Sequence, residues 1–202
     1  MTTAAGRPPR ADAARNVERL LDAARDVFAE HGPDATLKAV AERAGLGAMT
    51  LYRHFPNKEA LVRASLRRTI TERLAPVVAA TAADPDARRG LASLMDATLD
   101  LVDSERNLLA AGAGPLTADV TGPVLEPIAA LVARAQAAGQ VRADVTAADV
   151  PRIMGMVMSV LWGTEPGRGG WRRYLALVLD ALDPRSADPL PAADPEDRCG
   201  PC

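Results

Sequence analysis

One short stretch, residues 36–58, constrains the fold of this chain more than any other. It contains two apolar patterns of helical spacing, separated by Gly45, which stands where a left-handed residue ends a helix. In the second pattern Leu51 and Phe55 are four residues apart, so both lie on one helix face. Two short helices joined by a tight turn form the geometry that places the second helix in the major groove of DNA.

The same stretch carries the signals that begin and end short helices. Thr36 is a favourable cap for the first helix, Pro56 stops the second, and Asn57 is a favourable cap for the helix that follows. The apolar stripe of the first helix consists of Leu37, Val40, Ala41 and Ala44. These local signals agree with one another, so we predict helices over residues 37–44 and 48–55.

The sequence of this stretch resembles that of the TetR family of repressors. The resemblance rests on four motifs: Thr-Leu-x-x-Val-Ala at 36–41, Ala-Gly-Leu at 44–46, Thr-Leu-Tyr-x-His-Phe at 50–55 and Lys-Glu-Ala-Leu at 58–61. It extends over about residues 15–75, and the rest of the chain has a looser similarity to the SbtR-like type of C-terminal domain. The resemblance implies a DNA-binding unit of three helices, a homodimer and a small-molecule inducer.

Composition excludes several classes of protein. With 202 residues the chain is long enough to bury a core and to hold one or two domains. Alanine and leucine are abundant and alternating β-branched runs are nearly absent, which predicts an all-α fold. No apolar run approaches the roughly 18 residues of a membrane span. The polar residues 1–11 lack the apolar core of a secretory signal. We therefore expect a soluble, cytoplasmic protein with no membrane partner.

Charge is distributed unevenly along the chain. Residues 1–75 contain 13 Lys and Arg against 9 Asp and Glu, whereas residues 76–202 contain 11 against 17. Both lysines of the protein, Lys38 and Lys58, lie in the first part. A basic N-terminal part is suited to DNA phosphates, and an acidic remainder is held away from them. Chance is the alternative explanation, because the excess of basic residues is modest. The helix-turn-helix pattern gives more weight to the DNA-binding explanation.

Apolar periodicity and capping signals predict further helices along the chain. The expected helices span residues 12–31, 37–44, 48–55, 58–82, 86–102, a short helix capped by Ser104 and ending near Gly112, 122–138, 146–162 and 171–182. We assign residues 1–11 to a disordered arm and residues 12–75 to the DNA-binding domain. Residues 76–183 form a helical effector-binding and dimerisation domain, and residues 184–202 form a disordered tail.

No catalytic or metal-binding motif is found, so we expect neither an enzyme nor a bound cofactor or metal. The two histidines, His31 and His54, have no Cys or carboxylate cluster at ligand spacing. No P-loop or nucleophile elbow occurs. Cys199 and Cys202 form a Cys-Gly-Pro-Cys motif, but no helix follows to activate a redox cysteine. We interpret this pair as part of the tail, with redox or metal chemistry as the alternative.

Residues of the second short helix are the candidate contacts to DNA bases. Gly47, Ala48 and Met49 are small or apolar, so they favour close approach and contact with thymine methyl groups over paired hydrogen bonds. Thr50 and Arg53 can bond either a base or a phosphate.

Four further residues match phosphate contacts in the family that the stretch resembles: Thr36, Tyr52, His54 and Lys58. Packing or solvent exposure is the alternative role for Tyr52, His54 and Lys58. Arg7 and Arg10 could enter a minor groove as an arm, although a solvated tail is the simpler interpretation. The complete candidate set is Thr36, Lys38, Gly47, Ala48, Met49, Thr50, Tyr52, Arg53, His54 and Lys58.

Two more candidate sites lie in the C-terminal part. We expect a pocket for a largely apolar ligand, because methionines adapt to varied apolar shapes and no lysine is present to hold a phosphate. Its candidate lining residues are Met95, Leu99, Leu131, Met154, Met158 and Trp162. We expect the last two long helices to dimerise. The candidate interface residues are Trp171, Tyr174, Leu175 and Val178. Ordinary core packing is the alternative for both sets.

These observations together predict a two-part, all-α transcriptional repressor. As a homodimer it would bind a palindromic double-stranded DNA operator, because a two-fold protein presents two equal recognition helices. A small, largely apolar ligand would release it. An activator, or a regulator without a ligand, would carry the same DNA-binding helices. A helical enzyme or scaffold is a third alternative, which the lack of any acid–base or metal cluster disfavours.

Overall fold

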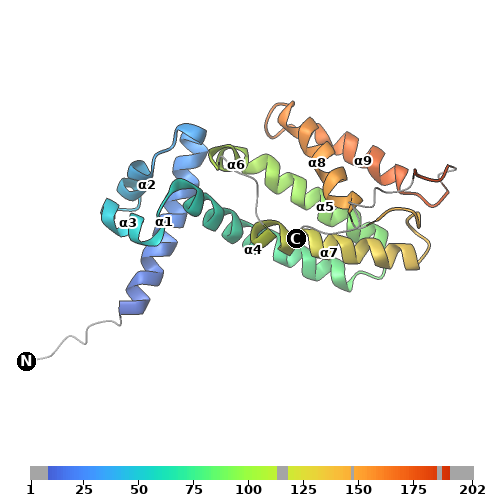
Figure 1. The fold of residues 1–202 in the computed structure, drawn as a ribbon, viewed down its shortest axis with the longest axis horizontal. Helices are drawn as coiled ribbons and strands as arrows, with labels where there is room; N and C mark the ends of the chain where they lie inside the picture. Colours follow the sequence, from blue (N-terminus) through green and yellow to red (C-terminus); the bar gives the residue numbers. More distant parts are fainter. Residues whose placement is uncertain (1–8, 113–117, 147, 186–187, 192–202) are drawn as a thin grey trace, which may run out of the picture. The chain divides into compact units, whose positions relative to one another are not determined.

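The computed structural model describes residues 9–112, 118–146, 148–185 and 188–191, and every regular element in these ranges is a helix. The first elements are α1 (Pro9–His31), the 3₁₀ turn η1 (Gly32–Asp34), α2 (Leu37–Arg43), α3 (Ala48–His54) and α4 (Lys58–Ala83). They are followed by α5 (Ala87–Ser104), α6 (Arg106–Ala111), α7 (Ala118–Ala137), α8 (Asp149–Trp162) and α9 (Trp171–Ala181), as Figure 1 shows. The predicted all-α fold class is confirmed.

The chain folds into two compact units. The N-terminal unit comprises Met1–Arg68 and Glu105–Leu116, and the C-terminal unit comprises Thr69–Ser104 and Thr117–Cys202. The sequence places a domain boundary after residue 75, whereas the compact units divide between Arg68 and Thr69. Both positions lie within α4. The short helix α6, expected in the second domain, packs against α1 and η1 in the first. The helix α4 therefore contributes residues to both units.

The N-terminal unit is built around one apolar face of α1. Leu20, Ala24 and Phe28 follow one another at intervals of four residues, and all three are fully buried. This face packs against α2 and α6, and Val40 and Ala41 of α2 are buried with it. The helical spacing predicted for residues 12–31 is thus the spacing that forms the core.

The C-terminal unit buries a larger apolar cluster, in which α5 runs beside α7 and contacts α8 and α9 (Figure 1). The large apolar side chains that α5 contributes to this cluster are Leu91, Leu94, Met95, Leu99 and Leu101. One face of α8, formed by Val150, Met154, Val157 and Leu161, packs into the same cluster. Ile153 and Met158 pack against the edge of this cluster, whereas Met156 and Trp162 are exposed, so part of the predicted second apolar side of α8 lies on the surface of the unit.

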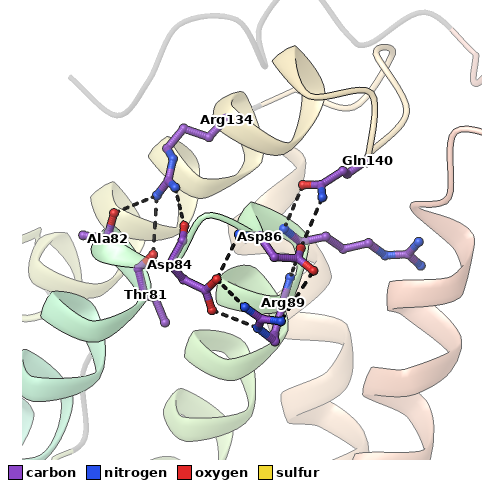
Figure 2. A network of polar contacts seen from close by, with 8 residues as sticks. Thr81, Ala82, Asp84, Asp86, Arg89, Arg134 and Gln140 are labelled. Carbon is purple, nitrogen blue, oxygen red and sulfur yellow. Dashed lines mark hydrogen bonds and ion pairs between the residues drawn. The ribbon is translucent and has the colours of Figure 1, made fainter.

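A polar network holds the turn between α4 and α5 (Figure 2). The guanidinium of Arg134, from α7, donates to the carbonyls of Ala82 at 3.1 Å and Asp84 at 2.6 Å. The carboxylate of Asp84 accepts two hydrogen bonds from Arg89, at 2.6 and 2.9 Å. Arg134 thereby satisfies carbonyls at the end of α4 that have no partner within the helix.

Three helix starts after α5 differ from the predicted positions. Ser104 is the last residue of α5, and its hydroxyl donates to the Leu101 carbonyl at 2.9 Å, so it does not cap α6. The helix α7 begins at Ala118 and not at residue 122, because Pro123 and Pro127 are accommodated inside it. The helix α8 begins after Thr146, whose N–H and hydroxyl both donate to the Asp149 carboxylate.

The N-terminal end of the described chain differs from the prediction. α1 already begins at Pro9, inside the arm expected over residues 1–11. Arg7, the side chain of Arg10, and the pair Cys199 and Cys202 lie outside the described residues.

Candidate DNA-binding site

The turn between α2 and α3 is held by an arginine of α1. Gly45 has a φ of +62°, the left-handed conformation that its position in the sequence predicts. The Nη2 atom of Arg19 donates to the Ala44 carbonyl at 2.6 Å. A Cβ on residue 45 would lie 3.1 Å from that nitrogen. Conformation and space both favour glycine here, and the contact with α1 sets the direction in which α3 leaves the turn.

The helix α3 is attached to the N-terminal unit by one buried face. Leu51 is fully buried and Phe55, its C-cap residue, is nearly so. The Phe55 N–H donates to the Leu51 carbonyl at 2.8 Å, which closes the helix. Asn57 then caps α4, because its Oδ1 accepts from the Ala60 N–H at 2.8 Å. These are the anchors and the cap that the sequence predicts, and they leave the opposite face of α3 free.

That opposite face consists of side chains that are open to solvent. Its exposed residues are Gly47, Ala48, Met49, Tyr52 and Arg53, with Thr50 half-buried. Met49 is 83% exposed and Tyr52 is 51% exposed. A large apolar side chain exposed to this degree adds little to the packing of its own unit, so the face is available to a partner.

Thr36 and Lys38 lie at the start of α2, the other short helix of the motif. The Thr36 Oγ1 accepts from the Ala39 N–H at 3.1 Å, as expected for an N-cap. Its hydroxyl proton remains able to donate to a phosphate. The Lys38 Nζ lies 3.8 Å from the Glu42 carboxylate, and both side chains are exposed. Such a pair is readily exchanged for a phosphate contact, since exposed ion pairs contribute only about 0.2–1 kcal/mol.

Lys58 has a different environment from the one that the sequence suggests. Its Nζ donates to the Pro33 carbonyl at 2.6 Å and lies 5.6 Å from the centre of the Phe28 ring. The ammonium therefore ties the start of α4 to η1 and α1. We reassign Lys58 from a phosphate contact to a residue that positions α4.

His54 is also more enclosed than a freely exposed phosphate contact would be. The residue is half-buried, its ring is tilted against Phe55 with centroids 6.5 Å apart, and its Nε2 atom is buried. Within the described part of the chain that nitrogen has no hydrogen-bond partner. A phosphate contact from this rotamer has to use Nδ1.

Ion pairs engage other arginines of the N-terminal unit. Arg43 donates to the Glu30 carboxylate at 2.7 and 3.1 Å, and this contact lowers the pKa of Glu30. Arg68 bonds the carboxylates of Glu18 and Asp22 at 3.0 and 2.7 Å. For Arg53, by contrast, no partner is recorded among the described residues. Arg53 is thus the guanidinium that α3 can offer to DNA.

Two positioning residues have no signal in the local sequence. Arg19 reaches the turn across 25 residues, and the Asn107 amide donates to the Ala29 carbonyl, 78 residues away, at 2.8 Å. Asn107 thereby fastens α6 to the end of α1. Neither residue belongs to the helix-turn-helix motif, so only the folded chain reveals its role.

The structure brings together most of the predicted pocket residues, but not all. Met95, Leu99, Leu131 and Met154 are buried in the apolar cluster of the C-terminal unit, and Met158 packs against its edge. Trp162 does not belong to the cluster, because it is the last residue of α8 and is 48% exposed. We therefore remove Trp162 from the candidate pocket.

The candidate interface residues divide in the same way. Trp171 is fully buried, and its Nε1 donates to the Asp103 carboxylate at 3.3 Å. Leu175 is buried in the same core, whereas Tyr174 is exposed and Val178 is half-buried. Trp171 and Leu175 thus fill the core of their own unit. The outward-facing apolar residues of α8 and α9 are Met156, Trp162, Tyr174 and Leu177.

The described residues contain neither a candidate metal site nor a candidate membrane span. No group of three or more His, Cys, Asp or Glu side chains there is placed to hold a metal ion. None of the helices there has the length and apolar character needed to cross a membrane.

Two family models match the chain, and together they cover both units. Residues 20–65 match the model described as bacterial regulatory proteins, tetR family. Residues 58–184 match the model of the transcriptional regulator SbtR-like, C-terminal domain.

Relatives with known names match different lengths of the chain. The HTH-type transcriptional regulator UidR of Escherichia coli (strain K12) is 45% identical over 47 residues, which are 23% of this chain and 24% of UidR. The HTH-type transcriptional repressor KstR2 of Rhodococcus jostii (strain RHA1) is 32% identical over 109 residues, 51% of this chain and 53% of KstR2. The chain thus spans about a quarter and about half of the length of these curated relatives.

A solved structure matches over nearly its whole length. The transcriptional regulator SCO0520 from Streptomyces coelicolor is 31% identical, with a TM-score of 0.59. The match covers 83% of this chain and 98% of that one. It includes both the helix-turn-helix and the helical C-terminal unit.

Proposed function

Since this chain belongs to the TetR family of transcriptional regulators, whose members are not enzymes, we propose that it is a repressor. As a homodimer it binds a palindromic DNA operator, and a small, largely apolar ligand releases it. The observation that carries the DNA-binding part is the outer face of α3, where Met49, Tyr52 and Arg53 are exposed opposite the buried anchors Leu51 and Phe55.

Each residue of this face has a chemical role in the proposed complex. Gly47 and Ala48 permit close approach to the groove, Met49 and Arg53 face base edges, and Thr50 bonds a base or a phosphate. Around them, phosphates are held by the hydroxyls of Thr36 and Tyr52, the ammonium of Lys38 and the imidazole of His54. Lys58 supports the start of α4 without reaching the DNA.

The exposed apolar residues of α8 and α9 support the homodimer. Met156 is 59% exposed and Leu177 is 55% exposed, and Trp162 and Tyr174 add aromatic area. Large exposed apolar side chains on adjacent helices are typical of a surface that a partner covers. A second copy presenting the same face forms a two-fold interface and gives the two equal recognition helices that a palindrome requires.

The apolar cluster of the C-terminal unit supports a largely apolar ligand. Met95 and Met154 lie in its centre and Met158 lies at its edge, and methionines adapt to ligands of different shape. The helix α4 carries residues of both units, so a ligand that prefers one position of α4 shifts the spacing of the two recognition helices. Repression is favoured over activation because the relative KstR2 is named as a repressor.

The experiment that tests DNA binding begins with selection of sequences from a random DNA pool. Tyr52→Phe should weaken binding to the selected operator about fivefold, on the order of 1 kcal/mol, because it removes one phosphate contact. The control is Ser93→Ala, which removes an exposed hydroxyl from α5, outside the proposed DNA-binding and dimer surfaces, and should leave affinity unchanged. Failure to enrich any sequence, or equal affinity of all three proteins, would contradict the proposal.

The regulatory part needs a separate test. Apolar compounds should be screened for release of the selected operator, with Met158→Trp as a variant that fills the edge of the cluster. Release that is lost in Met158→Trp, with DNA binding retained, supports the ligand site. Operator binding that no compound alters points to a regulator without a ligand, and transcription that rises with binding points to an activator.

A further inference from the structure

We propose that α3 identifies its operator through the C5 methyl group of a thymine, which Met49 contacts, and that the same position therefore accepts 5-methylcytosine. This inference rests on the proposed DNA-binding function and specifies what that site recognises. It assigns specificity at one base pair to an apolar contact and not to hydrogen bonds.

The side chains of the first turn of α3 carry the inference. Met49 is 83% exposed, so its thioether projects from the unit without an apolar neighbour to cover it. Ala48 is exposed as well, and a Cβ placed on Gly47 would meet nothing within 4 Å. None of these three residues has a side-chain N–H or O–H donor or a strong side-chain acceptor. Base edges opposite this turn therefore cannot be read by the paired hydrogen bonds of Arg, Asn or Gln.

Exposed side chains with hydrogen-bonding groups begin about one turn further along the helix, at Tyr52 and Arg53. Arg53 follows Met49 by four residues, so the two side chains lie on the same face. Arg53 is exposed, and within the described ranges it makes no hydrogen bond or ion pair. Thr50, the polar residue nearest to Met49 in sequence, is half-buried. In this proposal Met49 recognises one base pair by an apolar contact, and Arg53 recognises a neighbouring base pair of the same half-site by hydrogen bonds.

The chemistry of the major groove leaves one partner for an exposed methionine. Among the base edges there, thymine alone of the four standard bases presents an apolar group, its C5 methyl. A flexible thioether can pack against this group and cover it from water. In 5-methylcytosine the methyl group stands on the same carbon of the pyrimidine ring. The side chain of Met49 has no hydrogen-bond donor and no strong acceptor with which to distinguish the exocyclic groups of the two bases.

The size of the effect follows from burial of a single methyl group. Its removal should weaken binding about fourfold for one half-site. Because a two-fold dimer uses both half-sites, removal from both should weaken binding about 15-fold.

The test exchanges thymine for uracil, which removes only the methyl group, at each symmetric pair of positions of the selected operator in turn. We expect one symmetric pair of positions at which the wild-type protein loses about 15-fold in affinity. Met49→Ala should show no difference between thymine and uracil there. In a second background, with cytosine at that position, methylation of C5 should strengthen binding of the wild type but not of Met49→Ala.

A matched control keeps the apolar contact: Met49→Leu should retain the preference for the methyl group. If the wild type binds its operator but no exchange of thymine for uracil alters the affinity, methyl recognition is wrong while the proposed function stands. The same conclusion follows if Met49→Ala keeps the wild-type preference. If no DNA is selected at all, the proposed function fails, and this inference fails with it.

Discussion

At the scale of single residues, the two lysines of the chain have different environments. Lys58 contacts other residues of the protein, whereas Lys38 is available to DNA. Lys58 donates to the Pro33 carbonyl and lies over the Phe28 ring. Lys38 is exposed and has only an exposed carboxylate beside it, that of Glu42. One ammonium is thus part of the fold, and the other is available to a phosphate.

Replacement of each lysine by methionine should therefore have opposite consequences. Lys58→Met should lower the free energy of unfolding by about 1 kcal/mol, because the Pro33 carbonyl loses its donor, and should leave the salt dependence of operator binding unchanged. Lys38→Met should leave stability unchanged and reduce the log–log salt slope by about one. Thermal unfolding and binding at several salt concentrations measure the two quantities. A reduced slope in Lys58→Met would restore that residue to the phosphate contacts.

The same comparison shows which residue roles the sequence can predict. The caps by Thr36 and Asn57 follow from the sequence, because each bonds an N–H only three residues away. The contacts of Arg19 and Lys58 join residues 25 positions apart. No local pattern encodes such pairs, since they depend on how the helices pack. The exposure of Met49, by contrast, follows from its place opposite Leu51 and Phe55.

At the scale of elements, the end of α4 depends on Arg134. Its guanidinium donates to the carbonyls of Ala82 and Asp84, as Figure 2 shows. We expect Arg134→Met to destabilise the protein by about 1–2 kcal/mol, because these carbonyls lose a charged donor. Arg168→Met, which removes only an exposed pair with Glu165, should change stability by less than about 0.5 kcal/mol. Equal effects of the two variants in calorimetry would contradict this role for Arg134.

The same turn should make stability depend on acid pH. The hydrogen bonds from Arg89 lower the pKa of Asp84 below its ordinary value of 3.8. When folding lowers the pKa of a carboxyl group, the ionised group stabilises the fold at pH values above its ordinary pKa. This stabilisation is lost as the pH falls through the pKa of the folded state. Arg89→Met should therefore reduce the decline in melting temperature between about pH 5 and pH 3. A carboxyl titration of Asp84 by NMR that is identical in both proteins would refute this.

The helices that the sequence predicts best are α2, α3 and α4, whose ends lie within one residue of the predicted ranges, because the caps Thr36 and Asn57 and the stop at Pro56 mark them locally. The start of α7 is not predicted, because proline at residue 123 is usually a first-turn residue, whereas here it lies inside the helix. Some residues of α9 expected at the interface lie in the core, because an aromatic pattern alone does not distinguish core residues from interface residues. Trp171 joins the core through its bond to Asp103, and Leu177 remains outside.

At the scale of the whole molecule, the proposed dimer can be tested by a comparison of one exposed and one buried leucine of α9. Leu177 is 55% exposed and Leu175 is buried, although both belong to α9. Leu177→Asp should give a folded monomer, because it places a charge in the apolar interface. Leu175→Asp should unfold the C-terminal unit, because it buries a charge without a partner. Light scattering and circular dichroism separate the two outcomes. A folded dimer of Leu177→Asp would exclude this face as the interface.

The two tryptophans of the chain also make it a natural optical reporter. Trp171 is wholly enclosed, with its indole N–H bound to Asp103 and the Arg172 guanidinium 4.4 Å from its ring, whereas Trp162 is 48% exposed. Their fluorescence should therefore have a blue component from the core and a red component that aqueous iodide quenches. A second copy packed over Trp162 would shield the red component at high protein concentration. With Trp162→Phe, the remaining blue emission would follow unfolding of the core alone, so one cuvette could distinguish association from denaturation.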